Sequence, residues 1–350
     1  MIKVLVVDDS AFARLSIGRQ LASDSGIEIV GYANDGLEAL DKIKELQPNV
    51  VTLDVEMPRM DGLEALTRIM SDNPTPVVML SSLTDKGTDI TVRALELGAT
   101  DYFLKASKAT TSGFFGLDDN LNTKVKLAAA AGTLRPKVPQ IWKRSSTPVI
   151  KKPLPENSGE KLSNVIVIGS STGGPGALYQ VIPKLPGDLP AALLVVQHMP
   201  PVFTKSLASR LDELSNIQVK EAESGDRILP GRALLAPGNF HMEVKLGDKI
   251  AINQKPPIWG VRPSVDVTML SVSLAYGPAA SGVILTGMGC DGTKGAASIK
   301  AGGGRIIAQD EPSCVVYGMP RSVVESGNAD MVIPLQDMAA EIEKLCRERS

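Results

Sequence analysis

Three aspartates lie where two short apolar runs end, and their placement predicts a cation site. Asp8 and Asp9 follow the run IKVLVV, and Asp54 ends the run VVTLD. Ligands of an open parallel sheet bind outside the carboxyl ends of its strands, so we expect these carboxylates to converge there. Like charges that close destabilise one another unless a cation is bound, and Mg²⁺ suits an all-oxygen site.

Two further polar residues, Ser81 and Lys105, end the fourth and fifth apolar runs and should face the same pocket. A lysine can neutralise a phosphoryl group, and a hydroxyl can hydrogen-bond one. The set therefore predicts a carboxylate that accepts a phosphoryl group with help from metal and lysine. A single aspartate here is weak evidence, since Asp9-Ser10 also reads as a helix cap. Five polar residues at four strand ends are not explained by capping.

A second group of candidates begins with Ser171 in the sequence IGSSTGGPG. Gly169 to Gly173 fits the pattern G-x-S-x-G, whose glycines permit a sharp strand-to-helix turn that exposes the central serine. The backbone N–H of Thr172, at the opening of a helix, is then positioned to stabilise an oxyanion. A serine needs a neighbouring base to become a useful nucleophile.

The chain has two histidines, and one is the better candidate for that base. His198 follows the apolar run AALLVVQ at its carboxyl end, whereas His241 lies in a loop or hairpin start. Asp291, just past the run SGVILTG, is the candidate that orients the imidazole. Nucleophile, base and acid thus each follow a different strand.

Each of these signals also has a plainer interpretation. A lone G-x-S-x-G occurs by chance, a histidine at a strand end is commonly structural, and Asp291-Gly292 can be a helix cap. The glycines fit neither the G-x-G-x-x-G dinucleotide pattern nor a P-loop. The order serine, histidine, aspartate also differs from the α/β-hydrolase order. The joint placement of the three residues favours a serine hydrolase.

The elements that position the first site alternate between strand and helix. Apolar runs at 2–7, 27–33, 50–55, 76–82 and 101–105 predict strands, and amphipathic segments near 12–23, 36–46, 62–71, 86–97 and 117–131 predict helices. Near-continuous apolar strands between helices indicate a parallel sheet covered on both faces. We therefore predict a first domain over residues 1–131.

Residues 132–162 have the composition of a linker, with several prolines and little apolar periodicity. From Leu121 to Pro155 there is no acidic residue, while eight are basic. We interpret the segment as a solvated tether. The alternative is a docking segment for an acidic partner.

Residues 163–350 repeat the strand–helix alternation and predict a second doubly wound domain. Strands are expected at 164–170, 191–197, 218–222, 232–237, 281–287, 305–310 and 330–335, and helices near 175–184, 201–213, 265–276, 293–301 and 336–348. The segment 243–254, with a Gly-Asp turn, predicts a small antiparallel hairpin.

The amino-acid composition narrows the classes of partner that the protein could bind. Of 350 residues, 37 are basic and 39 acidic, giving a net charge of −2, which argues against a nucleic-acid-binding protein. The three scattered cysteines indicate reduced thiols, and no stretch reaches the length of a membrane span. The start MIKVLVVDDS is a buried strand rather than a signal peptide. We expect a cytoplasmic, monomeric protein that is not inserted in a membrane.

The first domain resembles the receiver domain of bacterial response regulators, which has a flavodoxin-like fold. The resemblance is carried by VVDDS, by the run from Asp54 to Gly62, by the serine pair at 81–82 and by Lys105. It implies phosphorylation of Asp54 by a histidine kinase, Mg²⁺ held by Asp9, Asp54 and the carbonyl of Glu56, and a switch through Ser81 and Tyr102. The sequence departs from the pattern at Ala106, where receivers usually have proline.

The second domain resembles the catalytic domain of chemotaxis protein-glutamate methylesterases, a Rossmann-like αβα fold. The segments that carry the resemblance are IGSSTGGP, VVQHMPPVFT, APGNFHME, RPSVDV, GVILTGMGCDG and CVVYGMPR. It supports Ser171, His198 and Asp291 in the roles given above and adds the backbone of Met288 as a second oxyanion donor.

The two resemblances together imply a phosphorylation-regulated carboxylic ester hydrolase without a cofactor in the esterase half. Its substrates would be glutamate methyl esters on methyl-accepting chemotaxis receptors, with deamidation of receptor glutamines as a side reaction. Two rival classes are a transcriptional regulator, which should carry a helix-turn-helix, and a binding module that has lost catalysis. The long, strand-rich second half and its retained triad disfavour both.

Overall fold

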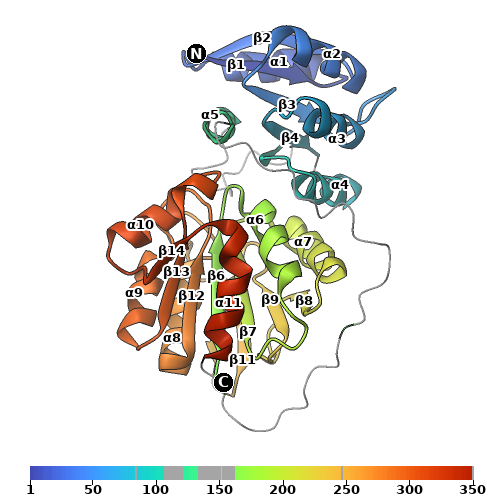
Figure 1. The fold of residues 1–350 in the computed structure, drawn as a ribbon. Coiled ribbons are helices and arrows are strands. Elements are labelled where there is room, and N and C mark those ends of the chain that lie inside the picture. The colour runs from blue at the N-terminus through green and yellow to red at the C-terminus, as the bar shows by residue number, and fades with distance from the viewer. Residues whose placement is uncertain (83–84, 106–120, 133–150, 152–161, 246, 349–350) are drawn as a thin grey trace. The chain divides into compact units, whose positions relative to one another are not determined.

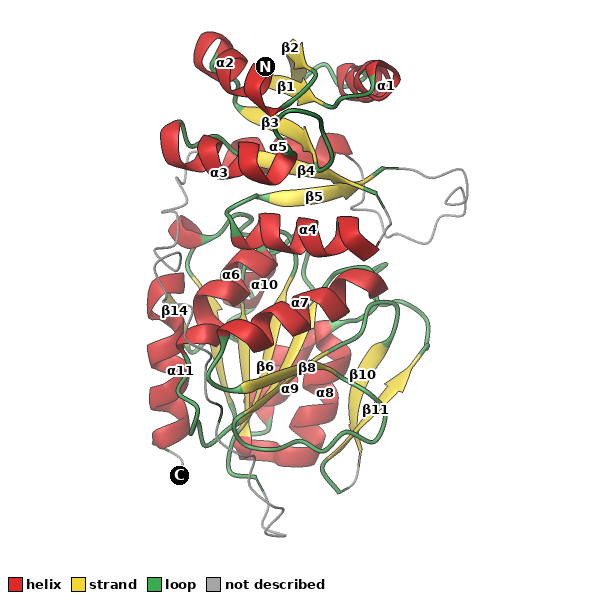
Figure 2. Ribbon diagram, turned by 90° about the vertical axis from the view of Figure 1, so that its right-hand side faces the viewer, coloured by secondary structure: helices red, strands yellow, loops and turns green. Residues whose placement is uncertain are grey.

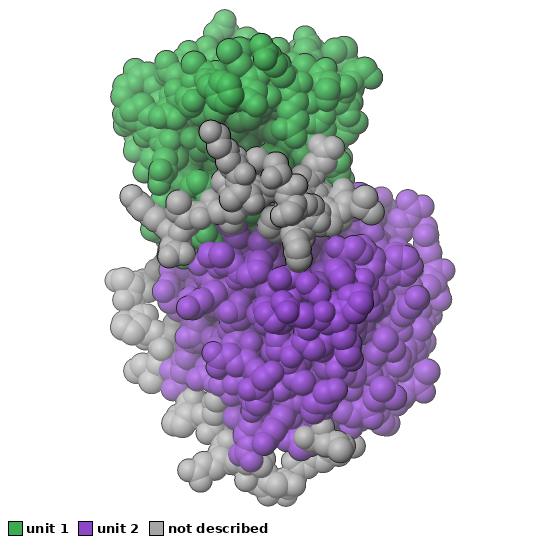
Figure 3. Space-filling view, turned by 180° about the vertical axis from the view of Figure 1, so that it is seen from behind, with its two compact units in different colours: residues 1–143 green, residues 144–350 purple. Residues whose placement is uncertain are grey.

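The computed structural model describes residues 1–82, 85–105, 121–132, 151, 162–245 and 247–348. The chain divides into two compact units, residues 1–143 and 144–350, which are coloured separately in Figure 3. Most of the linker predicted over 132–162 lies outside the described residues, as do Ala106 and the first part of the helix expected at 117–131.

The first unit is built on a five-stranded parallel sheet, as predicted, and its strand order is β2-β1-β3-β4-β5 (Figure 1). Its strands are β1 (Ile2–Val7), β2 (Ile27–Ala33), β3 (Val50–Asp54), β4 (Val77–Ser81) and β5 (Asp101–Leu104). Its helices are α1 (Ala11–Ala22), α2 (Gly36–Leu46), α3 (Gly62–Asp72), α4 (Asp85–Glu96) and α5 (Leu121–Ala131).

Burial and capping explain why these elements form. Every residue of β3 and β4 is buried, as expected for central strands covered on both faces. The side chains of Ser10, Asp35 and Asp61 accept backbone N–H groups at the starts of α1, α2 and α3. Helices α1 and α5 pack together through a shared core on one face of the sheet. Helix α3 packs between α2 and α4 and contacts both.

The second unit contains a seven-stranded parallel sheet in the order β14-β13-β12-β6-β7-β9-β8. The strands are β6 (Val165–Ser170), β7 (Ala192–Gln197), β8 (Gln218–Glu221), β9 (Arg232–Leu235), β12 (Ala280–Ile284), β13 (Arg305–Gln309) and β14 (Met331–Ile333). The central strands β6 and β7 are wholly buried. The chain runs outward from β6 through β7 and then returns to the other side at β12, so the strand order reverses beside β6. Such a reversal is where open α/β sheets bind ligands.

Helices cover both faces of this sheet (Figures 1 and 2). They are α6 (Gly174–Val181), α7 (Pro201–Leu214), α8 (Val265–Tyr276), α9 (Thr293–Ala301), α10 (Met319–Glu325) and α11 (Met338–Arg347), with short 3₁₀ turns at Ile182–Lys184, Gly277–Ala279, Glu311–Ser313 and Leu335–Asp337. The helix α10 was not predicted, because seven residues are too few for a clear 3.6-residue apolar period. Its Met319 and Val323 nevertheless pack into the core with α8 and α9.

The predicted antiparallel insertion is present as the hairpin β10 (His241–Lys245) and β11 (Lys249–Asn253). Gly247 and Asp248 in its turn both have positive φ, which matches the predicted Gly-Asp turn. The first strand starts at His241, two residues before the predicted segment. Within the described residues, no helix is long and apolar enough to cross a membrane.

Candidate functional site

Ser171 lies at the turn between β6 and α6, where the sequence predicted an exposed nucleophile. Gly173 has a φ of 76°, a conformation that favours glycine, and α6 begins at Gly174. The N–H of Ser171 donates to the carbonyl of Thr286, the residue two beyond β12 (3.0 Å). The serine is therefore fixed at the edge where β6 and its neighbour β12 end.

The two candidate oxyanion donors border this serine. Thr172 is the next residue, and its carbonyl accepts the hydroxyl of Thr286 (3.0 Å). Met288 follows Gly287, whose backbone passes close to Ser171. A Cβ added to Gly287 would lie only 2.8 Å from the Cβ of Ser171. In the part of the chain that the structure describes, neither the N–H of Thr172 nor that of Met288 donates to an acceptor. Both are available to a charge that develops on a substrate oxygen.

His198 and Asp291 form the clearest pair in the site. The Nε2 atom of His198 lies 2.8 Å from Oδ2 of Asp291, and Asp291 is 2% exposed. Burial alone would raise the pKa of this carboxyl, but the hydrogen bond and charge of His198, together with backbone donors, hold the pKa below its usual range. Asp291 is thus an ionised acceptor that fixes the imidazole with Nε2 as the protonated nitrogen.

Asp291 is itself held by four other donors at the start of α8 and α9. Its Oδ1 accepts the hydroxyl of Ser264 (2.8 Å) and the N–H groups of Asp266 and Gly292, and its Oδ2 accepts the N–H of Val265 (2.7 Å). A carboxylate with this many donors keeps both its charge and its orientation. Asp291 thus accepts the first N–H groups of α8 and not those of α9, the helix that follows it, while it also orients His198.

Ser171 comes directly after β6 and His198 directly after β7, and these two strands pair with each other. Ser170 on β6 pairs with Gln197 on β7, and the N–H of His198 donates to the carbonyl of Ser170 (3.1 Å). No hydrogen bond joins the Ser171 hydroxyl to His198 among the described residues. Such contacts are often long in ligand-free enzymes and shorten when substrate binds.

Gln197 joins these two residues in a way that the sequence analysis missed. Its buried amide donates to the carbonyls of both Ser171 (2.9 Å) and His198 (3.0 Å), and its Oε1 accepts the hydroxyl of Ser170 (2.6 Å). A Cβ on Gly174 would lie 2.0 Å from that oxygen, so this glycine leaves the space that the amide fills. We call this arrangement the Gln197 clamp. Gln197 lies in the segment VVQHMPPVFT that carries the family resemblance, but neither its residue type nor its position at a strand end indicated these contacts.

His241, the histidine that was not chosen as the base, lies near this site, but its ring has a different kind of hydrogen-bond partner. It is fully buried at the start of β10, and its Nε2 donates to the carbonyl of Pro256 (3.1 Å). Burial lowers its pKa, and the charge of Arg262 lowers it further. The two histidines differ in their partners, because His241 binds a backbone carbonyl whereas His198 binds the carboxylate of Asp291.

The acidic site of the first unit assembles as expected. Carboxylate oxygens of Asp8, Asp9 and Asp54 lie within 4.8 Å of one another, and the Nζ of Lys105 is 2.7 Å from both Asp8 and Asp54. Three carboxylates face one ammonium, which leaves an excess of negative charge that a divalent cation would balance. Burial raises the pKa of Asp54 to about 6, although Lys105 opposes the rise. The residues fit a hard dication such as Mg²⁺.

Three further predicted residues of this unit occupy separate places. Ser81 is buried beneath the site, where its hydroxyl accepts from Thr91 (2.8 Å) rather than contacting the carboxylates. Tyr102 is buried on β5, with the Nζ of Lys124 5.3 Å from its ring centre. Glu56 is exposed just beyond β3.

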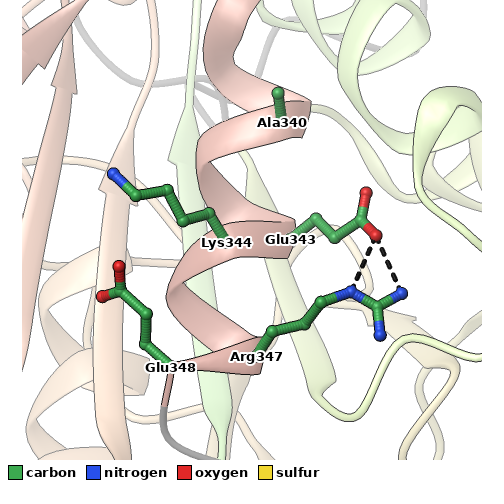
Figure 4. Close-up of a pocket in the computed structure, with 5 residues that line it drawn as sticks. All are labelled: Ala340, Glu343, Lys344, Arg347 and Glu348. Carbon is green, nitrogen blue, oxygen red and sulfur yellow. Dashed lines mark hydrogen bonds and ion pairs between the residues drawn. The ribbon is translucent and has the colours of Figure 1, made fainter.

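A shallow hollow on α11 holds none of the predicted residues (Figure 4). It is lined by Ala340, Glu343, Lys344, Arg347 and Glu348, and two guanidinium nitrogens of Arg347 donate to the same carboxylate oxygen of Glu343. Exposed ion pairs of this kind are ordinary on a helix surface. We assign this hollow no role in the chemistry.

Comparison with known proteins agrees with the geometry. The CheB methylesterase family matches residues 166–342, and the response regulator receiver domain family matches residues 4–111. A protein-glutamate methylesterase/protein-glutamine glutaminase of Symbiobacterium thermophilum is 50% identical over 99% of this chain and 98% of its own length. One of the same name from Pyrococcus horikoshii is 44% identical over 98% of this chain and 93% of its own.

Among solved structures, the Thermotoga maritima CheB methylesterase catalytic domain is 49% identical, with a TM-score of 0.51, over 52% of this chain and 98% of that domain. The family matches cover both units, and the relatives match nearly end to end. The chain belongs to the CheB methylesterase family, with a response regulator receiver domain in its first unit.

Proposed function

We propose that this chain is a serine esterase that hydrolyses glutamate 5-methyl esters on methyl-accepting chemotaxis receptors, releasing methanol and restoring glutamate. The observation that carries the proposal is the buried His198–Asp291 pair, one strand away from Ser171 and its turn. The names of the relatives supply the substrate class.

In the first step, Ser171 is the nucleophile and His198 the base. Because Nε2 of His198 donates to Asp291, the lone pair that can take the Ser171 proton is on Nδ1. The serine oxygen attacks the ester carbonyl, and the resulting oxyanion accepts hydrogen bonds from the N–H groups of Thr172 and Met288. The imidazolium that forms is stabilised by the ionised Asp291.

In the second step, the tetrahedral adduct collapses and the bond to the methoxy oxygen breaks. The proton on Nδ1 of His198 passes to that oxygen, and methanol leaves. Water then attacks the acyl-serine while His198 takes its proton. Breakdown of this second adduct returns the proton to Ser171 and frees the glutamate.

A serine-directed fluorophosphonate tests this assignment without a receptor. It should label intact protein at one site, located by peptide mass analysis at Ser171, and labelling should be lost in Ser171→Ala and much slower in His198→Asn. Ser326→Ala is the control, since Ser326 is an exposed serine that follows α10. Labelling that persists in Ser171→Ala would show that another residue is the nucleophile.

We also propose that the same site deamidates receptor glutamines, because both relatives carry that second activity in their names. The chemistry differs only in the leaving group, which is ammonia in place of methanol. Ammonia release from receptors that carry glutamine at the modified positions, compared between the intact protein and Ser171→Ala, tests it.

We propose that the first unit accepts a phosphoryl group on Asp54 from a histidine kinase of the same pathway. Asp8, Asp9, Asp54 and the carbonyl of Glu56 would hold Mg²⁺, which would supply positive charge to the phosphoryl oxygens. Lys105 already bridges Asp8 and Asp54 and would hold the phosphoryl group from the other side. Ser81 and Tyr102 would then relay the change. Such a kinase and its receptors imply a cytoplasmic enzyme.

Phosphorylation then controls the esterase in one of two ways. Either the unphosphorylated receiver hinders access to Ser171, or the phosphorylated receiver recruits the enzyme to receptors. The proposed boundaries, with the receiver at 1–131, the linker at 132–162 and the esterase at 163–350, allow a direct test. A fragment lacking residues 1–150 should label faster with fluorophosphonate if the first account holds, and at an unchanged rate if the second does.

A further inference from the structure

An exposed tryptophan lies on the surface beside the candidate triad and is not explained by the fold. Trp259 is 55% exposed, in a tight turn where Ile258 and Val261 exchange two backbone hydrogen bonds (3.0 and 3.1 Å). The two central residues, Trp259 and Gly260, have φ values of 54° and 78°. Turns of this kind favour asparagine or glycine at both positions, and a bulky residue there is strained. The turn itself therefore gives no reason for a tryptophan.

The indole is tied directly to the carboxylates behind the triad. Its Nε1 lies 3.3 Å from Oδ2 of Asp266, and the other oxygen of Asp266 accepts the N–H of Gly292 (3.0 Å). That same N–H also lies 3.1 Å from Oδ1 of Asp291. A single peptide group thus separates the carboxylate that holds the tryptophan from the one that holds His198. Since Asp266 and Asp291 are buried and Trp259 is not, the ring lies where this network meets solvent.

A cation shares this surface. The Nζ of Lys294, at the start of α9, lies 5.1 Å from the centre of the Trp259 ring, within the range of a cation–π contact. Lys294 is exposed, and no carboxylate of the described residues pairs with it. The neighbouring basic residues differ in this respect, because Lys255 pairs with Glu243 and Arg262 binds Asn239. The ammonium of Lys294 is free to pair with an anion from outside.

We propose that Trp259 and Lys294 form a docking lip for the protein substrate. The ring packs against an apolar side chain of the receptor segment that carries the ester, and the ammonium pairs with the carboxylate of a neighbouring glutamate. This inference rests on the proposed function, which makes the substrate a glutamate-bearing protein segment. An aromatic face beside an unpaired cation suits such a segment, and tryptophan is enriched among residues that dominate protein recognition.

The competing explanation is that the indole acts only through Asp266, by shielding it and the triad from water. The two explanations can be distinguished by comparing a protein substrate with a small reagent. A docking lip affects a protein substrate more than a small reagent, whereas a shield affects both alike. They also separate on Trp259→Phe, which keeps an aromatic face and loses the N–H that reaches Asp266.

The experiment measures kcat/KM for methanol release from methylated receptor membranes and, in parallel, the rate constant for fluorophosphonate labelling, using full-length protein. The variants are Trp259→Ala, Trp259→Phe and Lys294→Gln, with Leu274→Ala as the control. Leu274 is an apolar side chain that is 86% exposed, on α8. Thermal unfolding of each variant checks that it is folded.

We expect Trp259→Ala to lower kcat/KM on receptor about 10-fold, through KM, and to lower the labelling rate far less. Trp259→Phe should retain most of the wild-type value, and Lys294→Gln should weaken both receptor binding and its sensitivity to salt. Equal losses on receptor and reagent, or receptor kinetics that match Leu274→Ala, would overturn the docking lip. If wild-type protein releases no methanol at all, the proposed function fails instead, and the two failures are distinct.

Discussion

The imidazole of His198 meets Asp291 through Nε2, at 2.8 Å, so Nδ1 is the ring nitrogen left to exchange protons with Ser171. In the serine-protease template the aspartate is bound to Nδ1 and the serine faces Nε2. The present arrangement reverses the ring while keeping the three roles. It also makes the tautomer depend on Asp291, since only an acceptor at Nε2 keeps the lone pair on Nδ1.

Asp291→Asn should therefore abolish most of the activity. An asparagine amide can donate to Nε2, which would move the ring proton to Nδ1 and leave no base for Ser171. By analogy with the same change in a serine protease, we expect a loss of about 10⁴-fold in kcat. Fluorophosphonate labelling and methanol release both measure it. Ser264→Ala removes one of the donors to Asp291 and should cost far less. Near-normal activity in Asp291→Asn would contradict the orienting role.

The Gln197 clamp predicts that replacing Gln197 lowers both stability and activity, although this side chain contacts no reacting atom. Gln197→Met keeps the volume but leaves the carbonyls of Ser171 and His198 without their buried donor. We expect a stability loss of about 1–3 kcal/mol. Displacement of the nucleophile should also lower kcat by up to about 10²-fold with little change in KM.

The matched control for the clamp is Gln180→Met, a half-buried glutamine on α6 whose amide makes one weak contact. Urea unfolding gives the stability, and steady-state kinetics give kcat and KM. If Gln197→Met has the same kcat as Gln180→Met, Gln197 does not position the nucleophile and the base.

His241 predicts how stability changes with pH. Burial lowers its pKa in the folded state, while in the unfolded chain it titrates near its ordinary value of about 6.5. Between those two values only the unfolded state binds the proton, so stability falls as pH drops below about 6.5 and is fully present above it. His241→Gln has no group that titrates there.

Thermal unfolding of wild type and His241→Gln between pH 7.5 and 5.5 (a span of about two units around the free histidine) measures the effect. The midpoint of the wild type should fall more steeply than that of the variant. Parallel curves would mean that the folded His241 accepts a proton as easily as the unfolded one.

The acidic site predicts a requirement for both metal and a specific carboxylate. Phosphoryl incorporation from a small phosphoryl donor should be lost when Mg²⁺ is chelated and in Asp54→Asn, and reduced in Lys105→Ala. Asp61→Asn is the control, since this exposed aspartate caps α3 and lies outside the acidic cluster. Mass spectrometry of the intact protein measures the adduct. Incorporation in Asp54→Asn equal to that in wild type would place the acceptor elsewhere.

The sequence predicted the elements and most of the candidate residues because their signals are local. Buried, largely apolar strands such as β3 and β6, and polar residues at or just past their ends, can be recognised one segment at a time. What it missed depends on contacts between segments. α10 is helical because Met319 and Val323 pack on other helices. The Gln197 clamp needs the register of β6 and β7, and Trp259 is connected to the triad through Asp266 only in the folded chain.

The most direct test of the account is methanol release from methylated chemoreceptor membranes by the intact protein and by Ser171→Ala, each with and without a small phosphoryl donor. Release should require Ser171 and rise with the donor, so that one assay reports on both units. Release that is equal in Ser171→Ala, or no release from folded protein with intact substrate, would contradict it.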